Sequence, residues 1–470
     1  MVCCRYNHKA NQPVLLSNVL TMNPSDIMNN SSRPRSYFGS LQRFYRATTV
    51  HQAVFILLTV IALVSVGFES LGKGLFTFFM IFSVPLLLTE RQTLFRDPMV
   101  KLLGLILIAQ TLTWVNALYA HPEFAKDIPT LDRLSKLFSF VFIAYWLKGS
   151  TRAVLSLFAT FVVGVFVALA FAPDFHQDLI RALSGLRADF DIKNAQFTSM
   201  FAGVGMMICG FGYYWGATSN LKKAHKVLLL IVNTLALAGL TWLLVVSQSR
   251  QAWLALLLAV VILPIFLSLH SPRCRGKTLV GIYLAIALLV GLFSTSSIIE
   301  KRVDEENSVL STIISGDWQH IPMSSIGIRF NSWIEASHWI GEHPILGNSA
   351  AAIKQVIQQS DKFTPELKAE FGHLHNFHIE TFVSYGLVGL LLIYTMYYWL
   401  VRSMFIAQQE RPELMSFTVF SMMFMVFWLV VNFFETFSSR TFGVYTHNMI
   451  FGCLYTFYLA SSLKKNHQSE

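Results

Sequence analysis

The sequence is poor in charged side chains. Asp, Glu, Lys and Arg make up 13% of its 470 residues, whereas 54% of the residues are hydrophobic. Soluble domains carry about a quarter charged residues, so this composition disfavours a soluble multi-domain enzyme, although the length would allow two or three domains. Forty phenylalanines and a mean hydropathy of +0.52 instead predict that most of the chain lies in a lipid bilayer.

Two further features are missing. The first 46 residues contain no apolar run, so we expect no cleavable signal peptide and interpret residues 1–46 as a mostly disordered cytoplasmic tail. The chain has five cysteines, and none lies in a segment that we expect on the oxidising side of the membrane. A disulfide framework is therefore not expected.

Apolar runs of the length that crosses a bilayer, about 20 residues, recur along the chain. They predict an all-α integral membrane protein with about twelve transmembrane helices. We expect these helices near residues 48–68, 70–89, 99–119, 131–147, 152–172, 196–217, 225–246, 251–269, 278–297, 376–400, 413–434 and 441–462.

The charges are distributed unevenly between the loops. If the N-terminus is cytoplasmic, 21 Lys and Arg fall on the cytoplasmic side and 15 on the outer side, while Asp and Glu divide as 6 and 20. Lys and Arg in short loops set the orientation of membrane helices, so we expect both termini in the cytoplasm. The net charge of +10 then faces anionic membrane lipids, and no nucleic-acid partner is expected.

These expectations divide the chain into five segments. They are the tail 1–46, transmembrane helices one to nine in 47–297, a large outer loop in 298–374, helices ten to twelve in 375–462, and a short cytoplasmic tail in 463–470. A loop of this length is more often functional than idle. We expect it to cap the outer face of the membrane and to contain a helix near 328–340.

Two arginines at the outer boundary are candidates for binding an anion. Arg250 lies between two apolar runs, and Arg329 lies in the large loop. A guanidinium group is always charged and matches phosphate oxygens with two hydrogen bonds. The ordinary alternatives are that Arg250 extends along its helix to the interface and that Arg329 pairs with Glu335.

A histidine cluster at the start of the tenth expected helix is a second candidate. It comprises His373, His375 and His378. His373 and His375 would share a face only in an extended segment, whereas His375 and His378 would share one only in a helix. No Asp or Cys completes a recognisable ligand set, although Glu380 is nearby. We therefore expect no bound metal. A neutral histidine at the interface suits a general base instead.

The sequence resembles the O-antigen ligase and polymerase superfamily of bacterial membrane glycosyltransferases. The pattern is His375-Asn376, nine residues, then Gly386 and Gly389. An Arg-x-x-x-Leu motif matches Arg250 and Leu254, and an Arg followed by Trp and an acidic-x-Pro-x-x-Gly turn matches Arg329, Trp333 and 342–347. The match covers roughly residues 240 to 400, and the N-terminal half agrees only in hydropathy.

The resemblance implies a GT-C-like enzyme of the bacterial inner membrane with a periplasmic active site. Ligases of this family transfer a glycan from undecaprenyl diphosphate to lipid A–core oligosaccharide, without a nucleotide sugar, cofactor or metal and with inversion. Carried over to this sequence, His375 would accept the proton of the attacking hydroxyl, and Arg250 and Arg329 would hold the diphosphate. Asn376 and Trp333 are expected to contact substrate.

The shorter outer segment, 173–195, carries Arg187 and Lys193. They are weaker candidates for a further sugar or phosphate contact, because the acidic residues of this segment offer ordinary partners. We expect Gly386 and Gly389 to allow close helix packing in the bilayer.

Three alternatives stay open. An O-antigen polymerase would use the same donor but more often spreads its working residues over two outer loops. A protein O-oligosaccharyltransferase usually has a larger C-terminal periplasmic part. A transporter or flippase would need paired ionisable residues in mid-span, and such residues are nearly absent from this sequence. The ligase is preferred because the motif match is close and a single large loop comes late in the chain.

Overall fold

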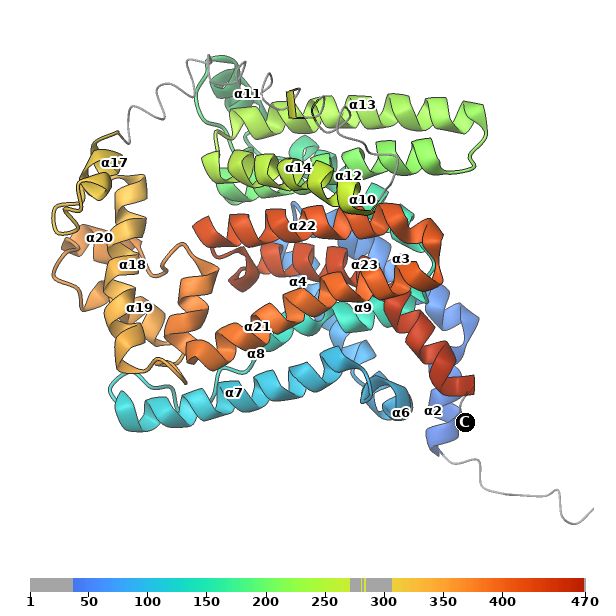
Figure 1. Cartoon of the computed structure of the whole chain (residues 1–470), viewed down its shortest axis with the longest axis horizontal. Helices are drawn as coiled ribbons and strands as arrows, with labels where there is room; N and C mark the ends of the chain where they lie inside the picture. The colour runs from blue at the N-terminus through green and yellow to red at the C-terminus, as the bar shows by residue number, and fades with distance from the viewer. Residues whose placement is uncertain (1–36, 271–279, 281–282, 285–306, 469–470) are drawn as a thin grey trace, which may run out of the picture.

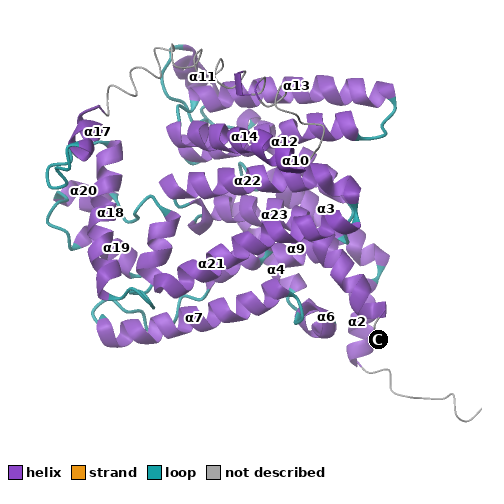
Figure 2. Ribbon diagram, viewed as in Figure 1, coloured by secondary structure: helices purple, strands orange, loops and turns teal. Residues whose placement is uncertain are grey.

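The computed structural model describes residues 37–270, 280, 283–284 and 307–468. These residues form helices and no strand (Figure 2). In Figure 1 the long helices run roughly horizontally in stacked layers, with α13 at one edge and α7 at the other. Four shorter helices, α17 to α20, stand at their left end.

The long helices and the segments between them have the following bounds. The first half contains α2 (Tyr37–Arg46), α3 (Thr48–Val64), α4 (Glu69–Ser83), α5 (Leu86–Thr89), α6 (Arg91–Leu94), α7 (Pro98–Ala120), α8 (Asp132–Ser135), η1 (Lys136–Phe138), α9 (Phe140–Leu147), α10 (Thr151–Ala170), α11 (Phe175–Leu183), α12 (Ala195–Thr218) and α13 (Lys223–Val246). The second half contains α14 (Arg250–His270), α17 (Asn307–Ile314), α18 (Ser325–Glu342), α19 (Ala352–Gln358), α20 (Pro365–Glu370), α21 (Phe377–Glu410), η2 (Pro412–Leu414), α22 (Met415–Phe434), η3 (Phe437–Ser439) and α23 (Thr441–Gln468).

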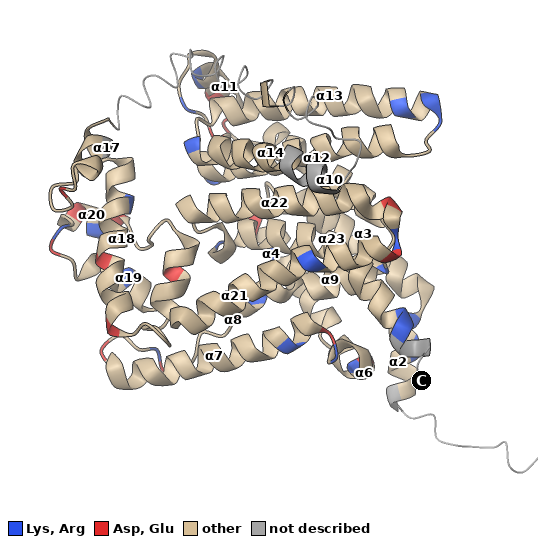
Figure 3. Ribbon diagram, viewed as in Figure 1, with Lys and Arg blue, Asp and Glu red and all other residues tan. Residues whose placement is uncertain are grey.

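The chain is a multi-pass helical membrane protein. Among the described residues, seven helices are long and apolar enough to cross a membrane, or eight if the pair Gly39–Arg46 and Thr48–Val64, bent by 56°, forms one span. Figure 3 shows that these helices carry few charges over most of their length. The expected run 131–147 is divided among α8, η1 and α9, and most of 278–297 lies outside the described residues. The number twelve therefore stays a prediction.

The expected N-terminal tail includes some regular structure. Its last ten residues form α2, and the hydroxyl of Tyr45 donates a hydrogen bond to the Phe82 carbonyl at 2.8 Å. Arg46 binds Glu90 through two hydrogen bonds of 2.7 and 2.9 Å. Residues 1–36, the rest of the expected tail, lie outside the described residues.

Polar side chains cap the first turns of several helices. Asn194 accepts hydrogen bonds from Gln196 N and Phe197 N at the start of α12, and Asn376 accepts them from His378 N and Ile379 N at the start of α21. Asp97 does the same for α7, where Pro98 occupies the first turn. These side chains satisfy backbone N–H groups that have no partner within the helix.

The α21 helix is broken at Gly386, whose φ of 60° and ψ of −163° are not helical. The turn that ends in Gly347 docks into this break, because Pro344 O and Ile345 O accept hydrogen bonds from Leu387 N and Val388 N. The expectation for Gly386 was close packing between helices. The structure instead places it against a loop, so that prediction is corrected.

The segment after α17 forms a helical group at one end of the bundle. Its longest helix, α18, contains the stretch 328–340 that we predicted to be helical. Ala336, Ile353, Val356 and Leu374 bury their side chains in a small apolar core of this group. Asn116 of α7 donates a hydrogen bond to Gly347 O at 3.1 Å, so the group is also attached to the edge of the bundle.

Candidate active site

A cavity of about 570 Å³ lies where the helical group meets the ends of the long helices. It is bounded by the start of α14, the first half of α18, the end of α22 and the loops beside them. Its lining residues are Arg187, Gln196, Gln248, Ser249, Arg250, Gln251, Leu254, Ser324, Ser325, Ile326, Arg329, Phe330, Trp333 and Phe434. Three arginines from separate parts of the sequence thus line one cavity.

Arg187 reaches the cavity because its segment is fastened to the end of α13. Ala188 N donates a hydrogen bond to Val246 O at 3.1 Å, and Arg187 Nε donates one to Ser247 O at 3.1 Å. Gln248 Nε2 binds Gly185 O at 2.9 Å, and Gln248 itself has a positive φ of 49°. This tight connection holds Arg187 beside the residue that begins α14, Arg250.

Arg329 lies in the first two turns of α18. Ser324 caps this helix by accepting a hydrogen bond from Gly327 N, and Arg329 Nη1 binds Ser325 O at 3.2 Å. Glu335, the partner considered from the sequence, instead lies 3.5 Å from Lys362 Nζ. The local fold therefore directs Arg329 to the same cavity as Arg250.

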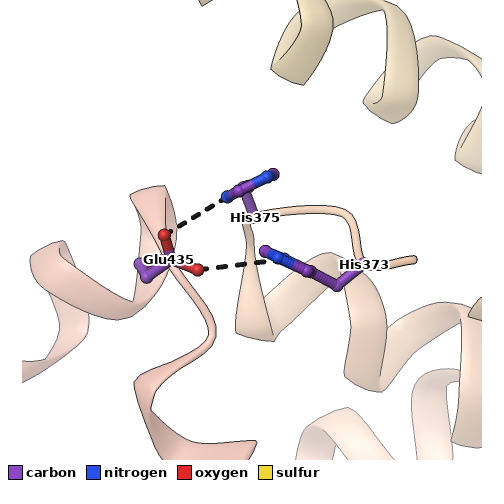
Figure 4. Close-up of side chains that lie close together, drawn as sticks. All are labelled: His373, His375 and Glu435. Carbon is purple, nitrogen blue, oxygen red and sulfur yellow. Dashed lines mark hydrogen bonds and ion pairs between the residues drawn. The ribbon is translucent and has the colours of Figure 1, made fainter. Parts of the chain in front are cut away.

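His375 lies beside this cavity in a short non-helical segment before α21. Its Nδ1 lies 3.2 Å from Glu435 Oε2, and the nearest Nδ1–carboxylate distance of His373 is 3.8 Å, to Glu435 Oε1. Figure 4 shows both rings turned toward the carboxylate. The backbone of His375 has a φ of 50°. Non-glycine residues rarely adopt this conformation, and the surrounding structure must stabilise it.

Two contacts join the His375–Glu435 pair to the cavity. Trp333, a lining residue, donates a hydrogen bond from its indole Nε1 to Leu374 O at 2.9 Å. Its ring also packs edge-on against the ring of Phe433, with 5.4 Å between the ring centroids. Trp333, in the cavity wall, therefore holds Leu374, which precedes His375, and Phe433, which lies two residues before Glu435.

The carboxylate of Glu435 is buried, with 4% of the residue exposed. Burial raises the pKa of Glu435, but the hydrogen bond from His375 and the nearby imidazole charges outweigh it and lower the pKa to about 2. Glu435 is thus an ionised acceptor. Burial and then the charge of His375 lower the pKa of His373 to about 3, so His373 is neutral near pH 7.

A second buried carboxylate holds the histidine segment in place. Glu380, 2% exposed, accepts a hydrogen bond from Leu374 N at 3.0 Å and forms an ion pair with Arg133 at 2.6 Å. Because Glu380 bridges α8 and the residue before His375, it fixes the backbone on which His375 is carried.

Two predicted site residues are placed differently. Lys193 Nζ lies 3.3 Å from both carboxylate oxygens of Glu69 and does not line the cavity. Asn376 is fully buried, and its amide oxygen caps α21. A direct role in substrate binding stays a prediction for both residues.

Sequence reasoning did not assign roles to Glu435 and Arg133. Glu435 follows a long apolar run and Arg133 begins one. Ionisable residues inside a membrane span are a signal for function, but Glu435 and Arg133 lie at the ends of apolar runs, and the sequence does not identify their partners. The partners lie 60 and 247 positions away along the chain.

Comparison with known proteins agrees with these motifs. Residues 235–394 match the sequence profile of the family described as O-antigen ligase, and the matched range contains Arg250, Arg329 and His375. An uncharacterized protein of Haemophilus influenzae is 29% identical over 192 residues, which covers 39% of this chain and 46% of that protein. The alignment thus spans less than half of the relative's length. The segment that carries most of the cavity and its neighbouring histidine, residues 235–394, is therefore the part of the chain that is similar to the O-antigen ligase family.

Proposed function

We propose that this protein is an O-antigen ligase of the bacterial inner membrane. It transfers a glycan from undecaprenyl diphosphate to a hydroxyl of lipid A–core oligosaccharide at the periplasmic face, with inversion and without a metal cofactor. The observation that carries the proposal is the meeting of Arg187, Arg250 and Arg329 in one cavity beside the pair of His375 and Glu435. The match of residues 235–394 to the O-antigen ligase family supports the same class of reaction.

The three arginines suit a diphosphate leaving group. Each guanidinium offers paired N–H donors in the geometry of phosphate oxygens, and a partly enclosed cavity strengthens charge interactions. When the bond between the anomeric carbon and the diphosphate oxygen breaks, the electron pair stays on the diphosphate. Donors already in place then stabilise the new charge, and one such contact contributes about 3 kcal/mol.

His375 supplies the base. In the tautomer in which Nδ1–H of His375 donates a hydrogen bond to Glu435, Nε2 is unprotonated and accepts the proton of the acceptor hydroxyl. The hydroxyl oxygen forms the new bond to the anomeric carbon on the face opposite the departing diphosphate. The ionised Glu435 then stabilises the imidazolium that results, so Glu435 acts as a positioning residue.

A lipopolysaccharide gel tests the activity. A strain that lacks this gene is complemented with wild type, His375→Ala, or His338→Ala, which changes an exposed histidine of α18. Wild type and His338→Ala should attach long polymer to core, whereas His375→Ala should leave bare core and accumulated lipid-linked polymer. Purified wild type should also keep its transfer rate after exhaustive EDTA treatment.

The alternatives give different results on this gel or in membrane vesicles. An O-antigen polymerase deficiency leaves core that carries a single repeat unit. A protein O-oligosaccharyltransferase, a transporter or a flippase leaves the ratio of capped to bare core unchanged when donor is supplied to membrane vesicles on the correct side. Either outcome would reject the ligase.

A further inference from the structure

The histidine segment and Glu435 together form a set of metal ligands that the sequence does not reveal. The ligand atoms that His373, His375 and Glu435 offer lie within 4.8 Å of one another (Figure 4). In the sequence no Asp or Cys completes a recognisable ligand set for the two histidines, and their spacing would place them on one face only in an extended segment. The structure supplies the acid, because Glu435 comes from the end of α22. It brings the two histidines together through a bend before α21, where His375 has a φ of 50°, and not through an extended segment.

We propose that His373, His375 and Glu435 bind a zinc-like divalent transition-metal ion, and that this ion switches off proton acceptance by His375. Binding itself follows from the ligand set and is independent of what the protein catalyses. The inhibitory consequence rests on the function proposed above. The ion is a reversible inhibitor and takes no part in the transfer.

The distances suit a small tetrahedral ion. With metal–ligand bonds of about 2.1 Å, a tetrahedral ion holds its ligand atoms roughly 3.4 Å apart. The Nδ1 atoms of His375 and His373 lie 3.2 and 3.8 Å from the two carboxylate oxygens of Glu435. Small side-chain rotations would therefore close the site around an ion, and a fourth position would be left for water.

The surroundings favour this ligand set. His373 Nδ1 is buried and has no hydrogen-bond partner among the described residues, so binding an ion would satisfy it. Thr436 N and Thr436 Oγ1 donate hydrogen bonds to Glu435 Oε1 at 3.1 and 3.4 Å and orient the carboxylate, as outer partners of metal ligands do. Two imidazoles select zinc-like ions over Mg²⁺ and Ca²⁺, which prefer oxygen.

Neighbouring charges weaken the site. Arg329 and Arg440 place positive charges near His373, and these charges repel a dication.

Another acidic pair in the described residues lacks these properties. Asp189 and Asp191 are separated by one residue, but Asp189 Oδ1 accepts a hydrogen bond from Asp191 N at 3.2 Å. Asp191 Oδ2 accepts one from Asp174 N at 3.1 Å. These carboxylates support the loop backbone, and no histidine joins them in a ligand group of the described residues.

Inhibition follows from the histidine tautomer. An ion on Nδ1 of His375 displaces the proton that this nitrogen shares with Glu435. The neutral, metal-bound imidazole carries its single proton on Nε2. Nε2 can then no longer accept the proton of the attacking hydroxyl, and Glu435, now a metal ligand, no longer stabilises an imidazolium.

The test uses the full-length protein in detergent, purified with a tag that contains no histidine and dialysed against EDTA and then buffer. Calorimetric titration with ZnCl₂ should show a binding event that MgCl₂ does not produce. His373→Asn should lose this event, and His338→Asn, which changes an exposed histidine, should keep it. His373→Gln serves as a second variant, and size-exclusion elution identifies any variant that has not folded.

A second titration measures transfer at increasing zinc, with each variant scaled to its own rate in EDTA. The zinc concentration that halves the rate should rise at least about tenfold in His373→Asn and stay unchanged in His338→Asn. Equal zinc binding by wild type and folded His373→Asn would overturn the site, as would an unshifted inhibition curve. Zinc binding without any glycan transfer would support the site and reject the proposed function, so the two failures are distinguishable.

Discussion

Gly347 and Gly386 meet at the break in α21. A Cβ atom added to Gly347 would lie 2.5 Å from Gly386 N, and both residues have a positive φ, of 72° and 60°. The acidic-x-Pro-x-x-Gly turn and the Gly-x-x-Gly pattern, 39 positions apart along the chain, are thus parts of one contact. The turn follows α18, which carries Arg329, and the break lies in α21, which begins just after His375. This contact therefore fixes the position of Arg329 relative to His375.

We predict that Gly347→Ala and Gly386→Ala each lower the thermal midpoint of the detergent-solubilised protein and reduce transfer. The left-handed conformation alone costs a non-glycine residue about 1–2 kcal/mol, and the added Cβ also contacts backbone atoms. Gly341→Ala is the matched control, because a Cβ at Gly341 in α18 meets nothing within 4 Å. Equal midpoints for all three variants would contradict the contact.

We predict that Glu435→Gln lowers kcat at least about tenfold, since the general base depends on a carboxylate to orient it and to stabilise its charged form. The KM for the lipid-linked donor should change little, because the diphosphate contacts the arginines. Glu413→Gln changes an exposed acid near the opposite end of α22 and should leave both constants unchanged. A rise in donor KM with an unchanged kcat would instead place Glu435 in donor binding.

Arg250→Lys and Arg329→Lys should each reduce kcat/KM for the donor about a hundredfold, or about 3 kcal/mol. Lysine keeps the charge but cannot make two parallel hydrogen bonds to one phosphate. Steady-state kinetics with purified protein measure the effect. Arg402→Lys, in the part of α21 far from the site, is the control, and its guanidinium binds the Tyr398 hydroxyl at 2.8 Å. Full activity in both site variants would remove the arginines from the mechanism.

Arg133→Met should destabilise the protein more than the double variant Arg133→Met/Glu380→Met does. Removing the cation alone leaves Glu380, 2% exposed, as an unpaired buried charge, and breaking such a pair costs about 3–5 kcal/mol. An apolar pair of similar volume avoids that cost, although Leu374 N then loses its acceptor. Thermal midpoints in detergent show which variant is less stable. If the double variant has the lower midpoint, the hydrogen bond from Leu374 N to Glu380 contributes more than the buried charge costs.

The helices and the local motifs can be predicted from the sequence. The contacts between them cannot. Apolar runs are a property of consecutive residues, so α7, α10, α12, α13 and α22 could be placed closely. The break at Gly386 could not be predicted, because a glycine inside an apolar run also suits close helix packing. Its non-helical conformation is stabilised by a turn from elsewhere in the chain.

The same distinction applies to the site. Arg250, Arg329 and Trp333 were proposed from motifs, and all three line the cavity. Arg187 and Lys193 share one weaker, loosely matched motif, and only Arg187 lines the cavity, whereas Lys193 pairs with Glu69 of α4. The pairing of His375 with Glu435 depends on where α22 ends relative to α21, a tertiary relationship that no spacing in the sequence expresses.

The lipid chain of the proposed donor suggests a last prediction. An apolar cavity of about 360 Å³ lies between α12, α13, α14 and α22, and its wall includes Gly210, Leu256, Val260 and Phe420. The α14 helix begins at Arg250 in the arginine-lined cavity and continues to Leu256 and Val260. A diphosphate held by Arg250 would therefore carry its polyisoprenoid chain along α14 into this space.

We predict that Gly210→Trp raises the KM for a donor with a long isoprenoid chain at least about tenfold, since each buried CH₂ contributes about 0.8 kcal/mol. A Cβ at Gly210 meets nothing within 4 Å, so the new side chain starts in open space at the cavity wall. Gly104→Trp on α7 is the matched control, because Gly104 is equally open and does not line this cavity. A donor with only a few isoprene units should be used equally well by both variants. If Gly210→Trp impaired long and short donors alike, the chain would follow another path and the variant would act by disturbing the helices.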